Sequence, residues 1–150
     1  MLRLSKKADY ALIAMKHLAL NRDGAVSVSA RGIAEQYDIP IELMAKVLQR
    51  LVRSGLLVST QGTRGGYTLR RGPASISVAD VIQSIDGPFT VTACSTENSG
   101  CEQYSKCSIR DPLWQIRERI AAALGTVTIA EMAGDGELAM NVPVAVVRRV

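Results

Sequence analysis

Two short β-type runs, separated by a glycine-rich turn, follow directly after an amphipathic helix in the first half of this chain. The runs cover residues 56–60 and 67–70, and the turn between them covers residues 61–66. Pro40 suits the first position of the preceding helix, and Gly55 suits its end. Apolar residues at helical spacing between them predict one buried helix face. This order restricts the first half of the chain to a helical module with a β-hairpin at its edge.

Two further helices are predicted upstream of that module. Ser5 can cap a first helix, whose apolar residues form one stripe before the turn at 21–24. Ser29 can cap a short second helix over 30–37, and residues 26–28 alternate like an edge strand. The order of helix, helix, turn, helix and hairpin is that of a winged helix-turn-helix.

The second half is predicted to contain three helices around a polar segment. Capping-box patterns begin at Ser77 and Thr128, and Asp111 can cap a helix with Pro112 in its first turn. The fold class is therefore mainly α, a winged helix-turn-helix with a two-stranded wing, a cysteine loop and a long C-terminal helix. We expect a DNA-binding domain over 1–73, a helix and cysteine loop over 74–110, a dimerisation helix and stub helix over 111–133, and a flexible tail over 134–150.

Charge is distributed unevenly along the chain. Residues 1–73 carry a net charge of +7 and residues 74–150 a net charge of −3, within a total of +4. A basic first half favours a polyanionic partner, and the winged-helix order makes double-stranded DNA the predicted one. The sequence has no phosphate-binding loop and no paired nucleophile and base, so we predict a binding protein and not an enzyme.

The helix after the turn is predicted to enter the major groove of DNA. Its outward side chains Glu42, Lys46 and Gln49 can read base edges, and Arg50 lies further along, towards the phosphates. Arg64 on the wing tip can enter the minor groove, although a solvated hairpin turn is the alternative. The predicted DNA-contacting residues are Ser29, Glu42, Lys46, Gln49, Arg50, Gln61 and Arg64.

All three cysteines lie within fourteen residues, with the spacing Cys94-x6-Cys101-x5-Cys107. No export signal precedes them, so we expect a cytoplasmic protein without a membrane segment and with reduced thiols. Thiolates are soft ligands that suit iron–sulfur clusters or zinc, and the spacing is a poor match to a structural zinc site. A metal-free disulfide switch between Cys101 and either neighbouring cysteine is the alternative.

The combination of motifs resembles the Rrf-type winged-helix regulators, the family that includes IscR and NsrR. The resemblance covers about residues 1–132, and the opening motif is most similar to the branch that regulates SUF iron–sulfur assembly genes. The motifs are Leu2-Arg3-Leu4-Ser5 with Asp9-Tyr10-Ala11-Leu12, Leu56-Leu57 after Ser54-Gly55, Arg64-Gly65-Gly66-Tyr67 and the three-cysteine loop.

This resemblance implies a homodimeric repressor that binds a palindromic operator and senses redox or cluster status. It implies a two-iron or four-iron cluster held by Cys94, Cys101 and Cys107. IscR-like members add a histidine three residues after the last cysteine, where this chain has Arg110, while NsrR-like members use an aspartate that aligns with Asp9. Asp9 also suits the helix dipole, so its role stays open. Iron–sulfur assembly genes are the implied target, and a nitric-oxide or redox sensor is the alternative.

Overall fold

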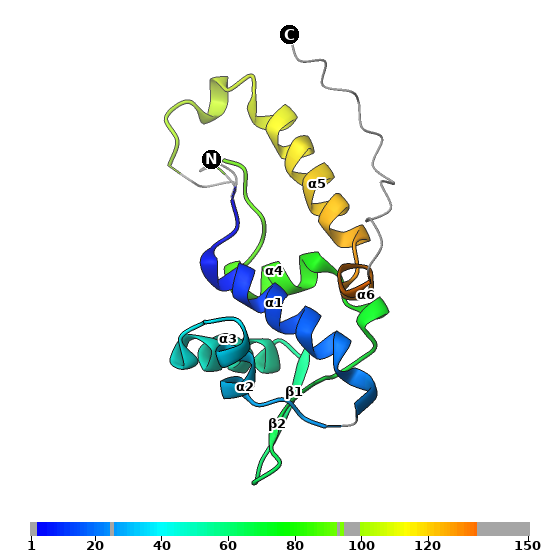
Figure 1. Ribbon diagram of the computed structural model, residues 1–150. Coiled ribbons are helices and arrows are strands. Elements are labelled where there is room, and N and C mark those ends of the chain that lie inside the picture. Colours follow the sequence, from blue (N-terminus) through cyan, green and yellow to red (C-terminus); the bar gives the residue numbers. More distant parts are fainter. Residues whose placement is uncertain (1–2, 25, 93, 95–99, 135–150) are drawn as a thin grey trace.

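The computed structural model describes residues 3–24, 26–92, 94 and 100–134 of the 150-residue chain. Within this part the chain is mainly helical with one antiparallel two-stranded sheet, which confirms the expected fold class (Figure 1). The elements are α1 (Lys6–Leu20), η1 (Arg22–Gly24), α2 (Ala30–Gln36), α3 (Ile41–Arg53), β1 (Leu57–Thr60), β2 (Gly66–Leu69), η2 (Pro73–Ser75), α4 (Val78–Asp86), η3 (Tyr104–Lys106), α5 (Arg110–Thr126) and α6 (Ile129–Ala133).

Four helices begin with the side-chain caps that the sequence predicts. Ser5 Oγ accepts from the Ala8 amide at the start of α1, and Ser29 does the same for α2. Ser77 and Thr128 form complete capping boxes at α4 and α6. These bonds satisfy amide groups that have no partner inside the helix, so the first turns are set by local sequence.

Three predicted helix boundaries are wrong. Pro40 is the residue before α3, which begins at Ile41. Asp111 does not cap α5; it lies inside the first turn, where its carboxylate accepts from the Arg110 side chain, and Ile109 occupies the cap position. Gly125 does not end α5, which continues to Thr126. The predicted tail beyond Gly134 lies outside the described residues.

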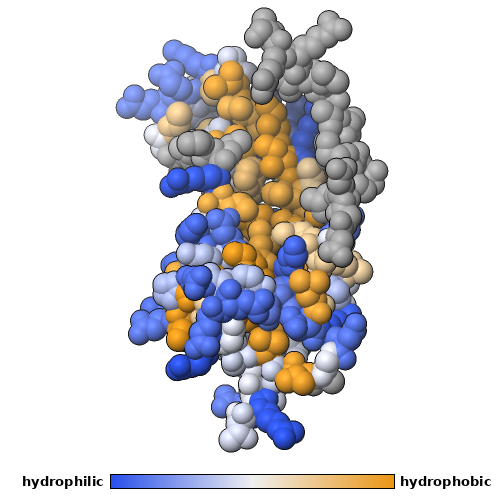
Figure 2. All heavy atoms as spheres, in the orientation of Figure 1, coloured by the Kyte–Doolittle hydropathy of each residue, from blue (hydrophilic) through white to orange (hydrophobic). Residues whose placement is uncertain are grey.

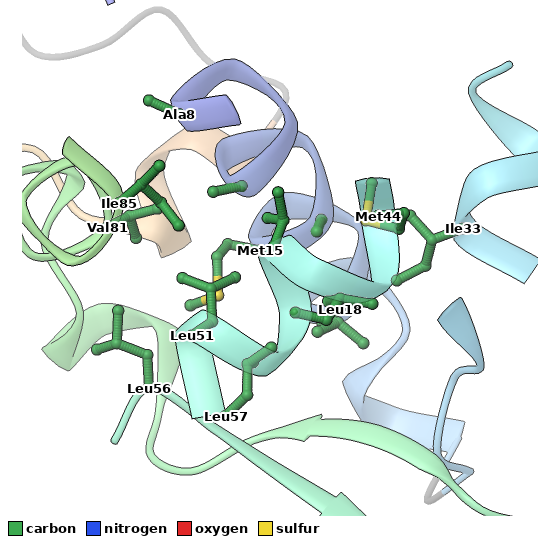
Figure 3. Packing of buried hydrophobic residues seen from close by; sticks show 14 of the residues in the cluster. Ala8, Met15, Leu18, Ile33, Met44, Leu51, Leu56, Leu57, Val81 and Ile85 are labelled. Carbon is green, nitrogen blue, oxygen red and sulfur yellow. The ribbon is translucent and has the colours of Figure 1, made fainter. Parts of the chain in front are cut away.

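One apolar core joins α1, α3 and α4, and it also includes side chains from α2, β1 and α6. Met15, Leu51 and Val81, one from each of these three helices, are completely buried in it (Figure 3). α6 reaches the core through Ile129, whose amide donates to the carbonyl of Ile76. The recognition module and the helix that follows it therefore share one core, and α4 lies against α1 and α3.

The β-hairpin is joined to the segment before α2 as well as to α3. Its strands pair from Leu57 opposite Leu69 to Thr60 opposite Gly66. Val28 and Tyr67 exchange two backbone hydrogen bonds of 3.1 and 2.8 Å. Only an isolated bridge at Val28 forms where the sequence suggested an edge strand. This bridge fixes the tip-proximal part of β2 against the segment before α2.

Helix α5 extends away from the shared core, and only its C-terminal end lies close to α4 and α6 (Figure 1). None of its residues is fully buried, although Leu113, Ile116 and Ile120 follow helical spacing. Ile116 is 45% exposed and Ile109, just before the helix, is 60% exposed. Apolar side chains form a continuous band over this end of the molecule (Figure 2). This apolar face needs a partner to be removed from water.

Candidate nucleic-acid interface and cysteine segment

Helix α3 presents a polar face because most of its apolar residues lie in the core, with Ile41 at its start exposed. Met44, Val47, Leu48 and Leu51 are buried. The exposed polar residues are Glu42, Lys46, Gln49, Arg50 and Arg53. Four of these five were predicted to contact DNA, and they lie on the helix that follows the turn. The position of this helix beside the hairpin is that of a recognition helix.

A groove of about 480 Å³ lies between α3, the start of α2 and the hairpin, and we call it the α3–wing groove. It brings together Ser29, Gln49 and Gln61, which lie far apart in the sequence. Arg53 also lines it. Three predicted DNA-contacting residues thus share one polar concave surface, whose side chains can both donate and accept hydrogen bonds.

A second groove of about 240 Å³, the α3–α4 groove, is basic. Lys46, Arg50 and Arg53 of α3 line it together with Lys7 of α1. Lys7 was not predicted as a DNA contact, because a lysine in the first turn of a helix carries no local signal of its tertiary neighbours. Four cations around one groove suit phosphate oxygens.

Arg50 links the recognition helix to α4. Its Nε donates to the carbonyl oxygen of Ser84 at 3.0 Å. The sequence predicts that this side chain contacts phosphates. The bond uses only Nε, so the two terminal guanidinium nitrogens can still bind a phosphate. At the other side of α4, the Ser5 amide donates to Asp86 at 3.2 Å. Helix α4 therefore touches both the recognition helix and the start of α1.

The wing tip is held by a residue that the sequence reasoning missed. Ser27 Oγ donates to the carbonyl oxygen of Arg64 at 2.6 Å. The Arg64 side chain itself is exposed. A serine 37 residues away along the chain thus fixes the backbone from which the wing arginine projects, and no sequence motif connects the two.

The cations of this surface are available to an anionic partner. In the described part of the chain, ion pairs involve Arg31, Arg71, Arg110 and Arg117. Lys7, Lys46, Arg50, Arg53 and Arg64 are in none of those pairs. Basic side chains outside these ion pairs, four around one groove and one on the wing, are the electrostatic footprint of a DNA-binding module.

The cysteine segment, residues 87–109, joins α4 to α5. All three thiols are free; Cys101 is exposed, whereas Cys94 and Cys107 are half-buried. Cys94 Sγ donates to Thr92 Oγ1 at 3.3 Å. Among the described residues, no three His, Cys, Asp or Glu side chains lie close enough together to hold a metal ion. The donor chemistry suits a cluster, but the described residues of one chain do not assemble the site.

Asp9, the predicted fourth ligand, lies half-buried in the first turn of α1. It lines a concave surface with Arg3, Leu4, Ser5 and Lys6, and none of the cysteines lines this surface. The structure therefore does not bring Asp9 together with the three thiols inside one chain.

His17, the single histidine of the chain, is a core residue. Its Nδ1 lies 3.0 Å from Tyr37 Oη, and the two rings meet edge to face. Burial lowers the pKa of His17 below its ordinary value. The neutral ring thus joins α1 to the end of α2, as expected for a packed histidine.

The basic recognition helix, its neighbouring wing and the shared core define a DNA-binding transcriptional regulator of the winged helix-turn-helix class. A family model described as Rrf2, iron-dependent transcriptional regulator, matches residues 4–135. The chain belongs to the Rrf2 family. It is a regulator and not an enzyme, in agreement with the sequence prediction.

Known proteins agree with this assignment. The chain is 32% identical over 138 residues to the HTH-type transcriptional regulator IscR of Klebsiella pneumoniae strain 342, covering 91% of this chain and 83% of that protein. It resembles the structure of CymR, the global cysteine regulator of B. subtilis, with 26% identity, a TM-score of 0.73 and coverage of 91% and 100%. It also resembles T. potens IscR, with 28% identity, a TM-score of 0.69 and coverage of 91% and 89%. Within the part of the chain that the structure describes, no helix has the length and apolar character to span a membrane.

Proposed function

We propose that this chain forms a homodimer that binds a palindromic operator, and that an iron–sulfur cluster held by its cysteines changes the operator affinity. The proposed targets are iron–sulfur assembly genes of the SUF type, which the dimer represses according to cluster status. The observation that carries this proposal is the position of the three cysteines. They lie between α4, which bonds the recognition helix, and α5, which exposes an apolar face.

DNA binding is assigned to the two grooves and the wing. Lys46, Gln49 and Glu42 lie on the exposed face of α3 and would read base edges. The cations of the α3–α4 groove would contact phosphates, and Arg64 would enter the minor groove. Ser29 and Gln61 border the α3–wing groove and would complete the contact.

Dimerisation is assigned to α5. Its exposed apolar residues include Ile116, and helical spacing places Leu113 and Ile120 on a continuous stripe. A second copy would cover this stripe, with a two-fold axis relating the recognition helices. Two such helices could then enter major grooves one turn apart, about 34 Å along the DNA. This geometry requires an operator with two inverted half-sites.

The cluster is assigned to Cys94, Cys101 and Cys107, with Asp9 from the second copy as the fourth donor. Free thiols in one short segment supply the soft ligands that such a cluster needs. When bound, the cluster would supply the chemistry that responds to iron or oxidants. In the protein itself, the signal would pass from the cysteine segment into α4. From α4 it would reach the start of α1 through the bond to Ser5, and the recognition helix through the bond to Arg50.

The test is anaerobic purification followed by iron and sulfide analysis, visible absorption and operator binding at one salt concentration. We expect a coloured protein whose operator affinity differs between the cluster-loaded and cluster-free forms. Alanine at Cys94, Cys101 or Cys107 should remove the colour, and Asp9→Asn should weaken cluster retention. Asp23→Asn, a change of the same charge on η1, is the matched control. A colourless protein, or equal affinities for the two forms, would reject the proposal.

A metal-free thiol switch is the second candidate, and the exposure of Cys101 favours it. In that case the purified protein contains no iron, and the number of free thiols falls on oxidation as a disulfide forms. Counting thiols before and after mild oxidation, together with operator affinity, distinguishes this mechanism from a cluster.

A further inference from the structure

The side chain of Arg110 joins the cysteine segment to helix α5. Its Nη1 donates to the carbonyl oxygen of Tyr104 at 3.1 Å, and its guanidinium carbon lies 4.5 Å from the centre of the Tyr104 ring. Its Nε donates to Asp111 Oδ1 at 2.8 Å. The guanidinium also lies 5.9 Å from the centre of the Trp114 ring. The Arg110 side chain is 24% exposed.

Tyr104 in turn is tied to the part of the segment that contains two of the three thiols. Its amide donates to the carbonyl oxygen of Cys101 at 3.1 Å. Cys107 follows directly after the η3 turn to which Tyr104 belongs. Tyr104 therefore connects the backbone at Cys101 with Arg110 at the start of α5. The η3 turn that begins at Tyr104 leads directly to Cys107.

We propose that Arg110 is a positioning residue that clamps residues 101–107 onto α5 before any cofactor is bound. The clamp holds two thiols in a defined place relative to the helix, while Cys94 enters the site from the opposite end of the segment. The effect on residues 101–107 stands on the contacts above. Its consequence for cluster retention rests on the proposed function.

The chemistry of this position suits arginine. The planar guanidinium stacks flat on aromatic faces and holds its N–H donors in a rigid fork, whereas a lysine ammonium is a compact point charge on a flexible stem. The hydrogen bond to Asp111 raises the pKa of Arg110, and the negative charge of Asp111 acts in the same direction. A permanent cation beside the segment would also offset the negative charge of thiolate ligands.

Arg117 provides a matched control on the same helix. Its guanidinium lies 5.7 Å from the centre of the Trp114 ring, and it bonds the adjacent Glu118 as Arg110 bonds Asp111. Its side chain is 25% exposed, close to the value for Arg110. None of its described contacts reaches the cysteine segment. Arg117→Gln thus removes a cation from the same ring without releasing residues 101–107.

The first experiment measures amide hydrogen exchange by mass spectrometry in the full-length, cofactor-free protein under reducing conditions. In Arg110→Gln we expect the amides of residues 101–107 to exchange about three to ten times faster than in the wild type, because one hydrogen bond and two ring contacts are lost. Arg117→Gln should leave that segment unchanged. Urea denaturation should show similar global stability for both variants. The proposal is overturned if residues 101–107 exchange equally fast in all three proteins, or if both variants accelerate them equally.

The second experiment loads each protein anaerobically with iron and sulfide and follows the loss of visible absorbance in a chelator. We expect loss several times faster in Arg110→Gln than in Arg117→Gln, with Arg110→Lys restoring little of the retention. Equal rates would overturn the role in retention. If the wild type takes up no cluster, the proposed function fails, and the exchange experiment alone still decides whether the clamp exists.

Discussion

Replacement of Gly66 by alanine should release the wing from the helical module. A Cβ at Gly66 would lie 2.6 Å from the carbonyl oxygen of Val28 and 2.7 Å from its carbonyl carbon. Both are backbone atoms, and they cannot retreat without breaking the two hydrogen bonds between Val28 and Tyr67. Each bond contributes about 0.5–1.5 kcal/mol, so we expect the free energy of unfolding to fall by about 1–3 kcal/mol.

Urea denaturation measures this loss, and operator binding measures its functional consequence. Since Arg64 projects from the same hairpin, Gly66→Ala should also weaken operator binding. Gly24→Ala is the control, because nothing lies within 4 Å of its added Cβ. That variant should stay within about 0.5 kcal/mol of the wild type. The reasoning is refuted if Gly66→Ala matches Gly24→Ala in both stability and operator affinity.

Three further changes test other parts of the structure. Lys7→Gln should reduce the steepness of the fall of log affinity with log salt by about 0.9, because one phosphate contact in the α3–α4 groove is lost. Lys16→Gln on the same helix should leave that slope unchanged. His17→Gln should flatten the acid side of the profile of unfolding free energy against pH. Burial lowers the pKa of His17 in the folded protein, so the stabilising contribution of the neutral ring in the wild type is present above about pH 6.5 and is lost as the pH falls towards the folded pKa. A variant with the wild-type profile would contradict this. Gly125→Ala should stabilise α5 by up to about 1 kcal/mol in thermal denaturation, since its Cβ meets open space; a lower melting temperature would argue against a regular helix there.

The predicted helix starts and ends agree with the structure where side chains only a few residues apart determine them. The serine caps of α1, α2 and α4 and the glycine that ends α3 are all present, and Gly55 adopts a positive φ of 79°. Caps and glycine stops depend on atoms only a few residues apart, so the sequence is sufficient to find them.

The errors come from competition between local signals. Asp111 and Pro112 have the pattern of a helix start, yet α5 begins at Arg110. The Asp111 carboxylate accepts from Arg110 Nε, and the cap position is taken by Ile109, which has no side-chain oxygen to offer. Glycine often ends a helix, yet α5 continues through Gly125 to Thr126.

Sequence alone determined the order of helices, the wing, the basic character of the first half and the clustering of the cysteines. It did so because helical periodicity, capping and charge are properties of neighbouring residues. Only the tertiary structure decided that Lys7 joins the α3–α4 groove, that Ser27 holds the wing tip and that Arg50 bonds α4. These contacts join residues tens of positions apart, and their geometry depends on how α1, α3 and α4 pack around one apolar core.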